Sequence, residues 1–164
     1  MRVFARGGSR ATPVADVATA AEVSTASVFR LFDGKLGLFV EAVDSCYDQV
    51  TAAVLAGADR ASSTSPEDKL DAMSDAYVEL VADRDLIALQ VHGTSACDVP
   101  EIREAVRRGL AKTTEAVTAA SAADDDAVQR FMAYGQLCHL VVQAELYDLD
   151  SPWAETMSHG IRHL

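Results

Sequence analysis

The stretch from Pro13 to Phe39, PVADVATAAEVSTASVFRLFDGKLGLF, decides the fold of this chain. Apolar residues between Val14 and Ala21 recur at spacings of three and four, which predicts a short helix with one apolar face. The same spacing returns between Val28 and Phe32 and predicts a second short helix. Only Glu22-Val23 separates the two helices, and Asp33-Gly34 ends the second. Two short helices joined by so tight a turn predict a helix-turn-helix, whose second helix lies in the major groove of DNA.

Three polar residues stand at the predicted helix starts. Thr12 is a suitable N-cap before Pro13, Ser24 caps the second helix, and Lys35 opens a third. Free backbone N–H groups at helix starts attract phosphate, so Thr12, Ser24 and Lys35 are candidate phosphate contacts. The alternative is that Thr12 and Ser24 act only as caps and that Lys35 is only a solvated surface charge.

The second helix also carries polar side chains away from its apolar face. These are Thr25, Ser27 and Arg30. Side chains near the start of a DNA-reading helix contact base edges, so we expect these three to enter the groove.

Residues 12–39 resemble the DNA-binding segment of the tetracycline-repressor (TetR) family, whose pattern is roughly T-x-x-x-I-A-x-x-A-G-V-S-x-G-x-L-Y-x-H-F-x-x-K-x-x-L. The A-x-V-S, F-x-x-F and Lys spacings of that pattern are all kept. The resemblance implies a dimeric, all-α transcriptional regulator, most often a repressor, that a ligand releases from a two-fold operator. Residues 40–164 are similar to the family in being helical and of suitable length.

Four residues depart from the family pattern. Glu22 replaces the usual turn Gly and, if that position is left-handed, costs roughly 1 kcal/mol. Ala26 replaces a Gly and moves a methyl group toward the DNA, and Leu31 stands where His is common. Phe29 replaces a Tyr whose hydroxyl in the family commonly reaches a phosphate, so Phe29 joins the DNA-binding candidates without that contact.

The segment before Thr12 is short for the family, which normally has a full first helix there. Val3–Ala5 look like the end of such a helix. We therefore expect a DNA-binding domain over residues 1–46 whose first helix is mostly missing, and a ligand-binding and dimerisation domain over residues 47–164. One alternative function follows, a ligand-binding or dimerisation module with impaired DNA binding.

The balance of charge also differs between the N-terminal segment and the rest of the chain. Residues 1–39 carry five basic and three acidic side chains, whereas the rest carries nine basic and 22 acidic ones. Phosphate repels an acidic surface, so double-stranded DNA is expected to meet only the N-terminal end. The acidic remainder is also what a soluble surface requires.

The chain lacks signals for export, membranes or disulfides. No apolar run approaches the roughly 20 residues that span a bilayer, and the N-terminus lacks an apolar signal segment. We therefore expect a cytoplasmic protein without a membrane partner. Cys46, Cys97 and Cys138 are widely spaced and predict buried reduced thiols, with a redox-sensing Cys97 as the alternative.

The rest of the chain predicts helices only, so the fold class is all-α: a helix-turn-helix followed by a helical bundle. A long helix over about residues 125–147 contains LCHLVV at residues 137–142, apolar on more than one face. A surface helix needs only one apolar stripe, so a second protein surface is expected to cover it. The resemblance implies a homodimer through about residues 125–164. The alternative is a helix buried centrally within one subunit.

The resemblance also implies a small apolar or amphipathic effector inside the bundle. Candidate wall residues combine apolar surface with polar handles. They are Tyr77, Leu89, His92, Phe131 and Tyr134. The alternative for each is an ordinary core position.

Enzyme and metal motifs are missing from the sequence. It contains no G-x-S-x-G, no phosphate-binding Gly loop and no H-E-x-x-H, so we expect no catalysis and no cofactor. A small helical enzyme using His92 or His139 is the remaining rival. His159 and His163 lie four apart, a spacing that can hold a metal, but without a third ligand they predict a surface pair.

Overall fold

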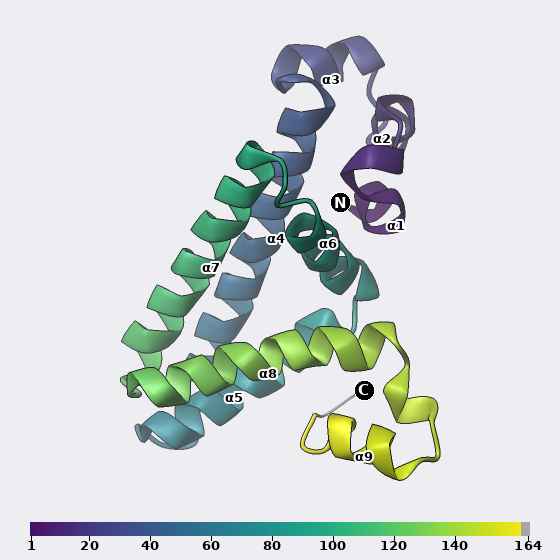
Figure 1. Ribbon diagram of the computed structural model, residues 1–164. Helices are drawn as coiled ribbons and strands as arrows, with labels where there is room; N and C mark the ends of the chain where they lie inside the picture. The colour runs from purple at the N-terminus through teal and green to yellow at the C-terminus, as the bar shows by residue number, and fades with distance from the viewer. Residues whose placement is uncertain (162–164) are drawn as a thin grey trace. The chain divides into compact units, whose positions relative to one another are not determined.

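The computed structural model describes residues 1–161, and all regular structure within them is helical (Figure 1). The all-α prediction is therefore confirmed. The helices are α1 (Arg2–Ala11), α2 (Val14–Ala20), α3 (Thr25–Leu31), α4 (Gly34–Asp59), α5 (Pro66–Val81), α6 (Arg84–Ser95), α7 (Pro100–Ser121), α8 (Asp125–Gln143), the 3-10 turn η1 (Leu146–Asp148) and α9 (Pro152–Ser158).

The chain divides into two compact units. The first unit is Met1–Asp48 with Asp85–Ala111, and the second is Gln49–Arg84 with Lys112–Leu164. The long helices α4 and α7 each contribute residues to both units. The expected boundary between a DNA-binding and a ligand-binding domain after residue 46 stays a prediction.

The first helix continues beyond Val3–Ala5, where its end was predicted from the sequence. It runs from Arg2 to Ala11 and contains one non-helical residue, Gly8, at φ 61°. That backbone angle suits glycine, which lacks a Cβ atom. Phe4 is 1% exposed, and its ring meets the ring of Phe39 edge-on with the centroids 5.1 Å apart. Such aromatic pairs stabilise beyond their buried area, so α1 anchors the start of α4.

Local capping explains where two helices of the second unit begin. The Ser65 hydroxyl accepts a hydrogen bond from the Asp68 N–H at 3.1 Å, and Pro66 occupies the first position of α5. The Asp124 carboxylate accepts from the Ala127 N–H at 2.8 Å and starts α8. Both are standard N-caps, and each satisfies a backbone donor that the helix leaves without a partner.

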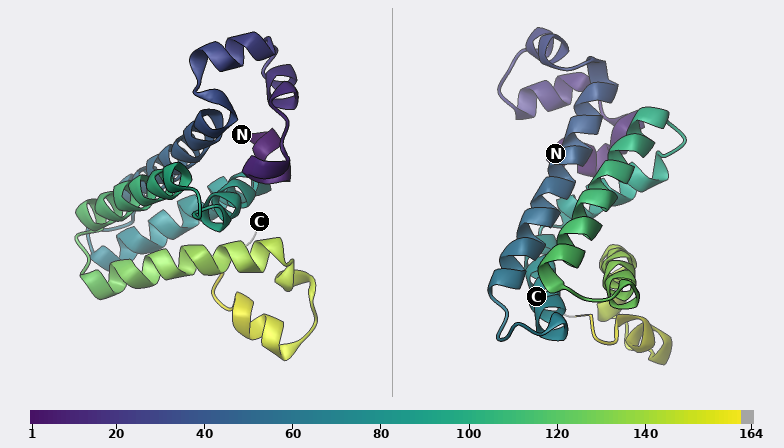
Figure 2. Two further views of the ribbon diagram at one scale, coloured as in Figure 1. Left: turned by 45° about the horizontal axis from the view of Figure 1, so that its top comes forward. Right: turned by 90° about the vertical axis from the view of Figure 1, so that its left-hand side faces the viewer.

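The end of α8 differs from the sequence prediction. The helix was expected to continue to about Tyr147 but ends at Gln143, because Glu145 adopts a left-handed conformation at φ 51°. The chain then turns through η1 into α9, as the two views of Figure 2 also show. Val141, Leu146 and Ala154 form a buried cluster that holds these three elements together.

Candidate nucleic-acid interface

The predicted helix-turn-helix is present as α2, the turn Ala21–Ser24 and α3. Ala18 and Val28, one from each helix, are the buried side chains of the pair. The Ser24 hydroxyl accepts a hydrogen bond from the Ser27 N–H at 3.1 Å, so the predicted cap of the second helix is confirmed. The two hydroxyl oxygens also lie 2.9 Å apart. Ser24 therefore fixes the start of the DNA-reading helix.

Thr12 does not cap the first helix of the motif, and that prediction is wrong. Pro13 takes the cap position in an extended conformation, and α2 begins at Val14 without a side-chain cap. Because a residue before proline is held in the extended region, Thr12 ends α1 instead. Its side chain is 2% exposed, and its hydroxyl donates to the Val3 carbonyl at 3.3 Å. In this position Thr12 does not present its hydroxyl to a phosphate.

The turn contains the strained residue that the sequence pattern indicated. Glu22 has φ 56°, in the left-handed region where a Cβ atom crowds the backbone. The strain costs roughly 1 kcal/mol, as expected for a residue other than glycine there.

Replacing Glu22 with Gly should therefore raise the free energy of unfolding by about 1 kcal/mol, because glycine adopts this angle without strain. Urea denaturation followed by circular dichroism measures the change. Glu22→Ala is the matched control, since it removes the charge but keeps the Cβ atom. Equal gains from both variants would mean that the charge, and not the backbone angle, is responsible.

The outward face of α3 carries most of the predicted base contacts. Val28 is buried, and Thr25, Ala26, Phe29 and Arg30 are exposed. Ser27 is half-buried because it packs beside the Ser24 cap. Thr25 and Arg30 are thus available to DNA in the described structure, while Ser27 is less so.

Lys35 has a partner within the protein. Its ammonium group donates to the Arg10 carbonyl at 3.0 Å, which joins the start of α4 to the last turn of α1. An ammonium group has three N–H donors, so a phosphate contact by Lys35 is compatible with this bond and stays a prediction.

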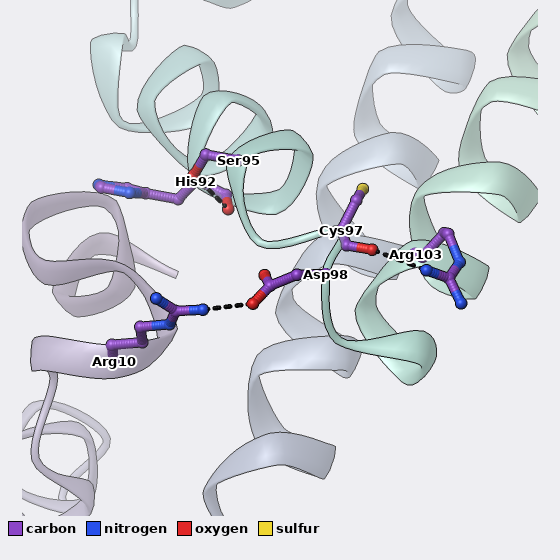
Figure 3. A network of polar contacts seen from close by, with 6 residues as sticks. All are labelled: Arg10, His92, Ser95, Cys97, Asp98 and Arg103. Carbon is purple, nitrogen blue, oxygen red and sulfur yellow. Dashed lines mark hydrogen bonds and ion pairs between the residues drawn. The ribbon is translucent and has the colours of Figure 1, made fainter.

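A polar network within the first unit joins α1 to the segment around the end of α6 (Figure 3). The Arg10 guanidinium pairs with the Asp98 carboxylate, and the His92 Nε2 donates to the Ala5 carbonyl at 3.1 Å. Arg103 donates to the Cys97 carbonyl at 3.0 Å. The Arg10–Asp98 pair is exposed and contributes at most about 1 kcal/mol.

The predicted ligand residues fall into different units. Leu89 and His92 belong to the first unit, and Leu89 is 0% exposed. His92 lies against Gly8, where an added Cβ would be 2.9 Å from the His92 Nδ1 atom. Tyr77, Phe131 and Tyr134 belong to the second unit. A pocket formed by all five stays a prediction.

Within the second unit, sequence reasoning missed a buried polar pair. The Tyr77 hydroxyl and the His139 Nε2 atom are 2.7 Å apart, and both residues are buried. Burial lowers the pKa of His139 to about 4, so the imidazole is neutral at neutral pH. The helical spacing of the sequence placed His139 on α8 but could not show which residue of α5 it meets.

The three cysteines differ in their burial, and His159 is the remaining histidine that the structure describes. Burial raises the pKa of the Cys46 thiol to about 12 and also raises the pKa of Cys138. Cys97 is half-buried, with its sulfur 3.5 Å from the Gly93 carbonyl oxygen. His159 is exposed, and His163 lies outside the described residues. Within residues 1–161 no three His, Cys, Asp or Glu side chains cluster as metal ligands would.

Across residues 1–161, no helix combines the length and apolarity that crossing a bilayer would demand.

Comparison with known proteins agrees with this geometry. Residues 1–42 match the family of bacterial regulatory proteins described as the tetR family. That range contains α1, α2, α3 and the start of α4. No curated protein matches the chain. Residues 1–42 therefore carry the N-terminal DNA-binding domain of the tetR family, which supports a DNA-binding transcriptional regulator.

Proposed function

We propose that the protein is a ligand-responsive repressor that binds a two-fold operator as a homodimer and acts in the cytoplasm. The observation that carries this proposal is the exposed outward face of α3 in a domain that matches a regulator family. Arg30 on that face can donate two hydrogen bonds to one guanine in the major groove. The excess of basic side chains within residues 1–39 favours contact with DNA at this end of the chain.

Exposed apolar side chains support a homodimer through about residues 125–164. Leu140 is 60% exposed and Trp153 is 56% exposed. On α8, Leu140 lies opposite the buried residues Cys138 and Val142, and exposed Ala133 shares its face. Exposed Ala144 follows as the C-cap of the helix. Large exposed apolar residues beside small ones suit close packing against a second copy of the helix. Two copies would place two DNA-reading helices on two half-sites.

The Tyr77–His139 pair supports a ligand site in the second unit. Apolar pockets use a few polar groups to orient a ligand, and this pair is a buried polar group on α5 and α8. A small apolar or amphipathic effector that exchanged its own polar group for one partner would change how the two helices pack. A coupling of roughly 1–3 kcal/mol to the DNA-binding segment is typical of allosteric proteins.

The alternative is a ligand-binding or dimerisation module with weak DNA binding. The strained turn at Glu22 and the missing hydroxyl at Phe29 favour it, since each weakens the DNA-binding segment relative to the family pattern. A small helical enzyme is the weaker alternative. The His92 ring is hydrogen-bonded to the Ala5 carbonyl and the His139 ring to the Tyr77 hydroxyl, so each already has a partner within its own unit.

The proposal is tested by selecting duplexes from a random DNA pool with the full chain and measuring binding at several salt concentrations. Affinity for the selected duplex should fall steeply with salt, because phosphate contacts release counterions. Arg30→Ala should lower the preference for that duplex over random DNA by about 10- to 100-fold, the value of a bidentate base contact. Sedimentation of the same protein should give the mass of two chains.

Arg107→Ala is the matched control, because Arg107 is an exposed arginine on α7 outside the matched domain. It should leave the preference unchanged. Failure to enrich any duplex, with the protein folded and dimeric, would favour the module with weak DNA binding.

A further inference from the structure

The outward face of α3 combines apolar and cationic groups in a fixed spacing. Ala26 lies three residues before Phe29 and four before Arg30. Side chains at these spacings are neighbours on a helix, so the three share the face opposite buried Val28. Phe29 is 56% exposed, and Ala26 and Arg30 are exposed as well. A methyl group and a phenyl ring therefore lie beside one guanidinium group on this face.

Ala26 and Phe29 neither cap α3 nor form its buried side. The cap of α3 is the Ser24 hydroxyl, and the side chain that α3 buries is Val28. The nearest acidic residues in the sequence are Glu22 in the turn and Asp33 after the helix, so no carboxylate lies on α3 itself. The face thus suits an anionic partner that also presents an apolar group.

The DNA major groove offers one such apolar group. Among the four bases only thymine presents a methyl group there, and alanine and phenylalanine side chains make apolar contact with it. Guanine presents two acceptors, O6 and N7, that suit an arginine fork. The chemistry of the face therefore corresponds to a thymine and a guanine close together in one half-site.

We propose that Ala26 and Phe29 read the methyl group of a thymine in the operator, next to a guanine that Arg30 contacts. This inference rests on the proposed function, because it assigns a base preference to the same helix. The pair supplies discrimination by removing the methyl group from water, which needs no hydrogen bond. The thymine contact would also account for the exposed ring of Phe29, which has no hydroxyl to donate to a phosphate.

The test uses the duplex selected from the random pool. Each thymine in turn is replaced by deoxyuridine, which removes only the methyl group and keeps the base pair. At one thymine in each half-site, affinity should fall by about threefold to tenfold, as expected for the loss of a buried methyl group. The other thymines should tolerate the change.

Variants then assign the effect to side chains. In Phe29→Ala the thymine and deoxyuridine duplexes should bind equally, because the ring that covers the methyl group is gone. Arg30→Ala is the matched control on the same face and should keep the sensitivity to deoxyuridine while losing the preference for guanine. Circular dichroism and thermal unfolding check that Phe29→Ala, a change at an exposed position, leaves the fold intact.

The outcomes separate this inference from the function on which it rests. If no duplex is enriched, the proposed function fails and the thymine contact fails with it. If a duplex is enriched but contains no thymine sensitive to deoxyuridine, the thymine contact is wrong while DNA reading stands. Sensitivity that persists unchanged in Phe29→Ala would also overturn the assignment.

Discussion

Gly109→Ala is expected to destabilise the protein by about 3 kcal/mol, the upper end of the usual cost of overpacking. A Cβ atom at this position of α7 would lie 2.2 Å from the Tyr47 Cγ atom, 2.3 Å from Cδ2 and 2.8 Å from Cβ. These atoms are at the base of the Tyr47 side chain, so rotating its far end does not relieve the clash. Tyr47 is 4% exposed, which leaves little room for the ring to move. The two helices would have to separate locally.

Urea denaturation of the variant measures this cost. Gly135→Ala is the matched control, since it adds the same methyl group inside α8, where the nearest atom is the Tyr77 Cε1 at 3.9 Å. There the substitution should stabilise by about 0.5–1 kcal/mol, because alanine favours a helix. In a double variant with Tyr47→Ala, the cost of Gly109→Ala should be smaller than in the wild type. Equal stability of wild type and Gly109→Ala would show that α7 and α4 are not packed this closely.

The second large effect is a loss of stability in mild acid that depends on His139. Burial lowers its pKa to about 4 in the folded protein, against about 6.5 in an unfolded chain. As the pH falls below 6.5, His139 becomes protonated in the unfolded chain but stays neutral in the folded protein. The contribution is therefore fully present above pH 6.5 and is lost as the pH falls toward 4. Between pH 7 and pH 5 the loss should be about 2 kcal/mol.

The free energy of unfolding at pH 7 and pH 5, measured for wild type and His139→Gln, tests this expectation. Glutamine has no proton to gain in this range, so the variant should lose less stability than the wild type on acidification. His159→Gln is the matched control, because His159 is exposed. It should follow the wild type. Parallel pH profiles for wild type and His139→Gln would contradict the proposed role of burial.

Local features of the DNA-binding segment could be predicted from the sequence because they depend on neighbouring residues. The Ser24 cap, the short turn and the strained Glu22 all follow from side chains within a few positions. The error at Thr12 has the same local origin. Proline at position 13 was placed inside the helix, whereas its extended conformation makes it the cap and turns Thr12 inward.

Features that depend on packing could not be predicted in the same way. The sequence named His92 as a candidate ligand residue and His92 or His139 as the base of an alternative enzyme, but helical spacing does not show which element each one meets. His92 contacts the Ala5 carbonyl in the first unit, and His139 contacts Tyr77 in the second. The end of α8 was missed for a similar reason, since a glutamate at position 145 does not by itself predict a left-handed backbone conformation.

The sharing of α4 and α7 between the two units limits how such a protein can evolve. Recombination that exchanged one unit for that of another regulator would have to cut both helices in mid-course and rejoin them in the correct rotational phase. A new specificity in either unit is therefore more accessible through single substitutions than through gene shuffling. In this chain, changes in either unit must accumulate on helices to which both units contribute residues.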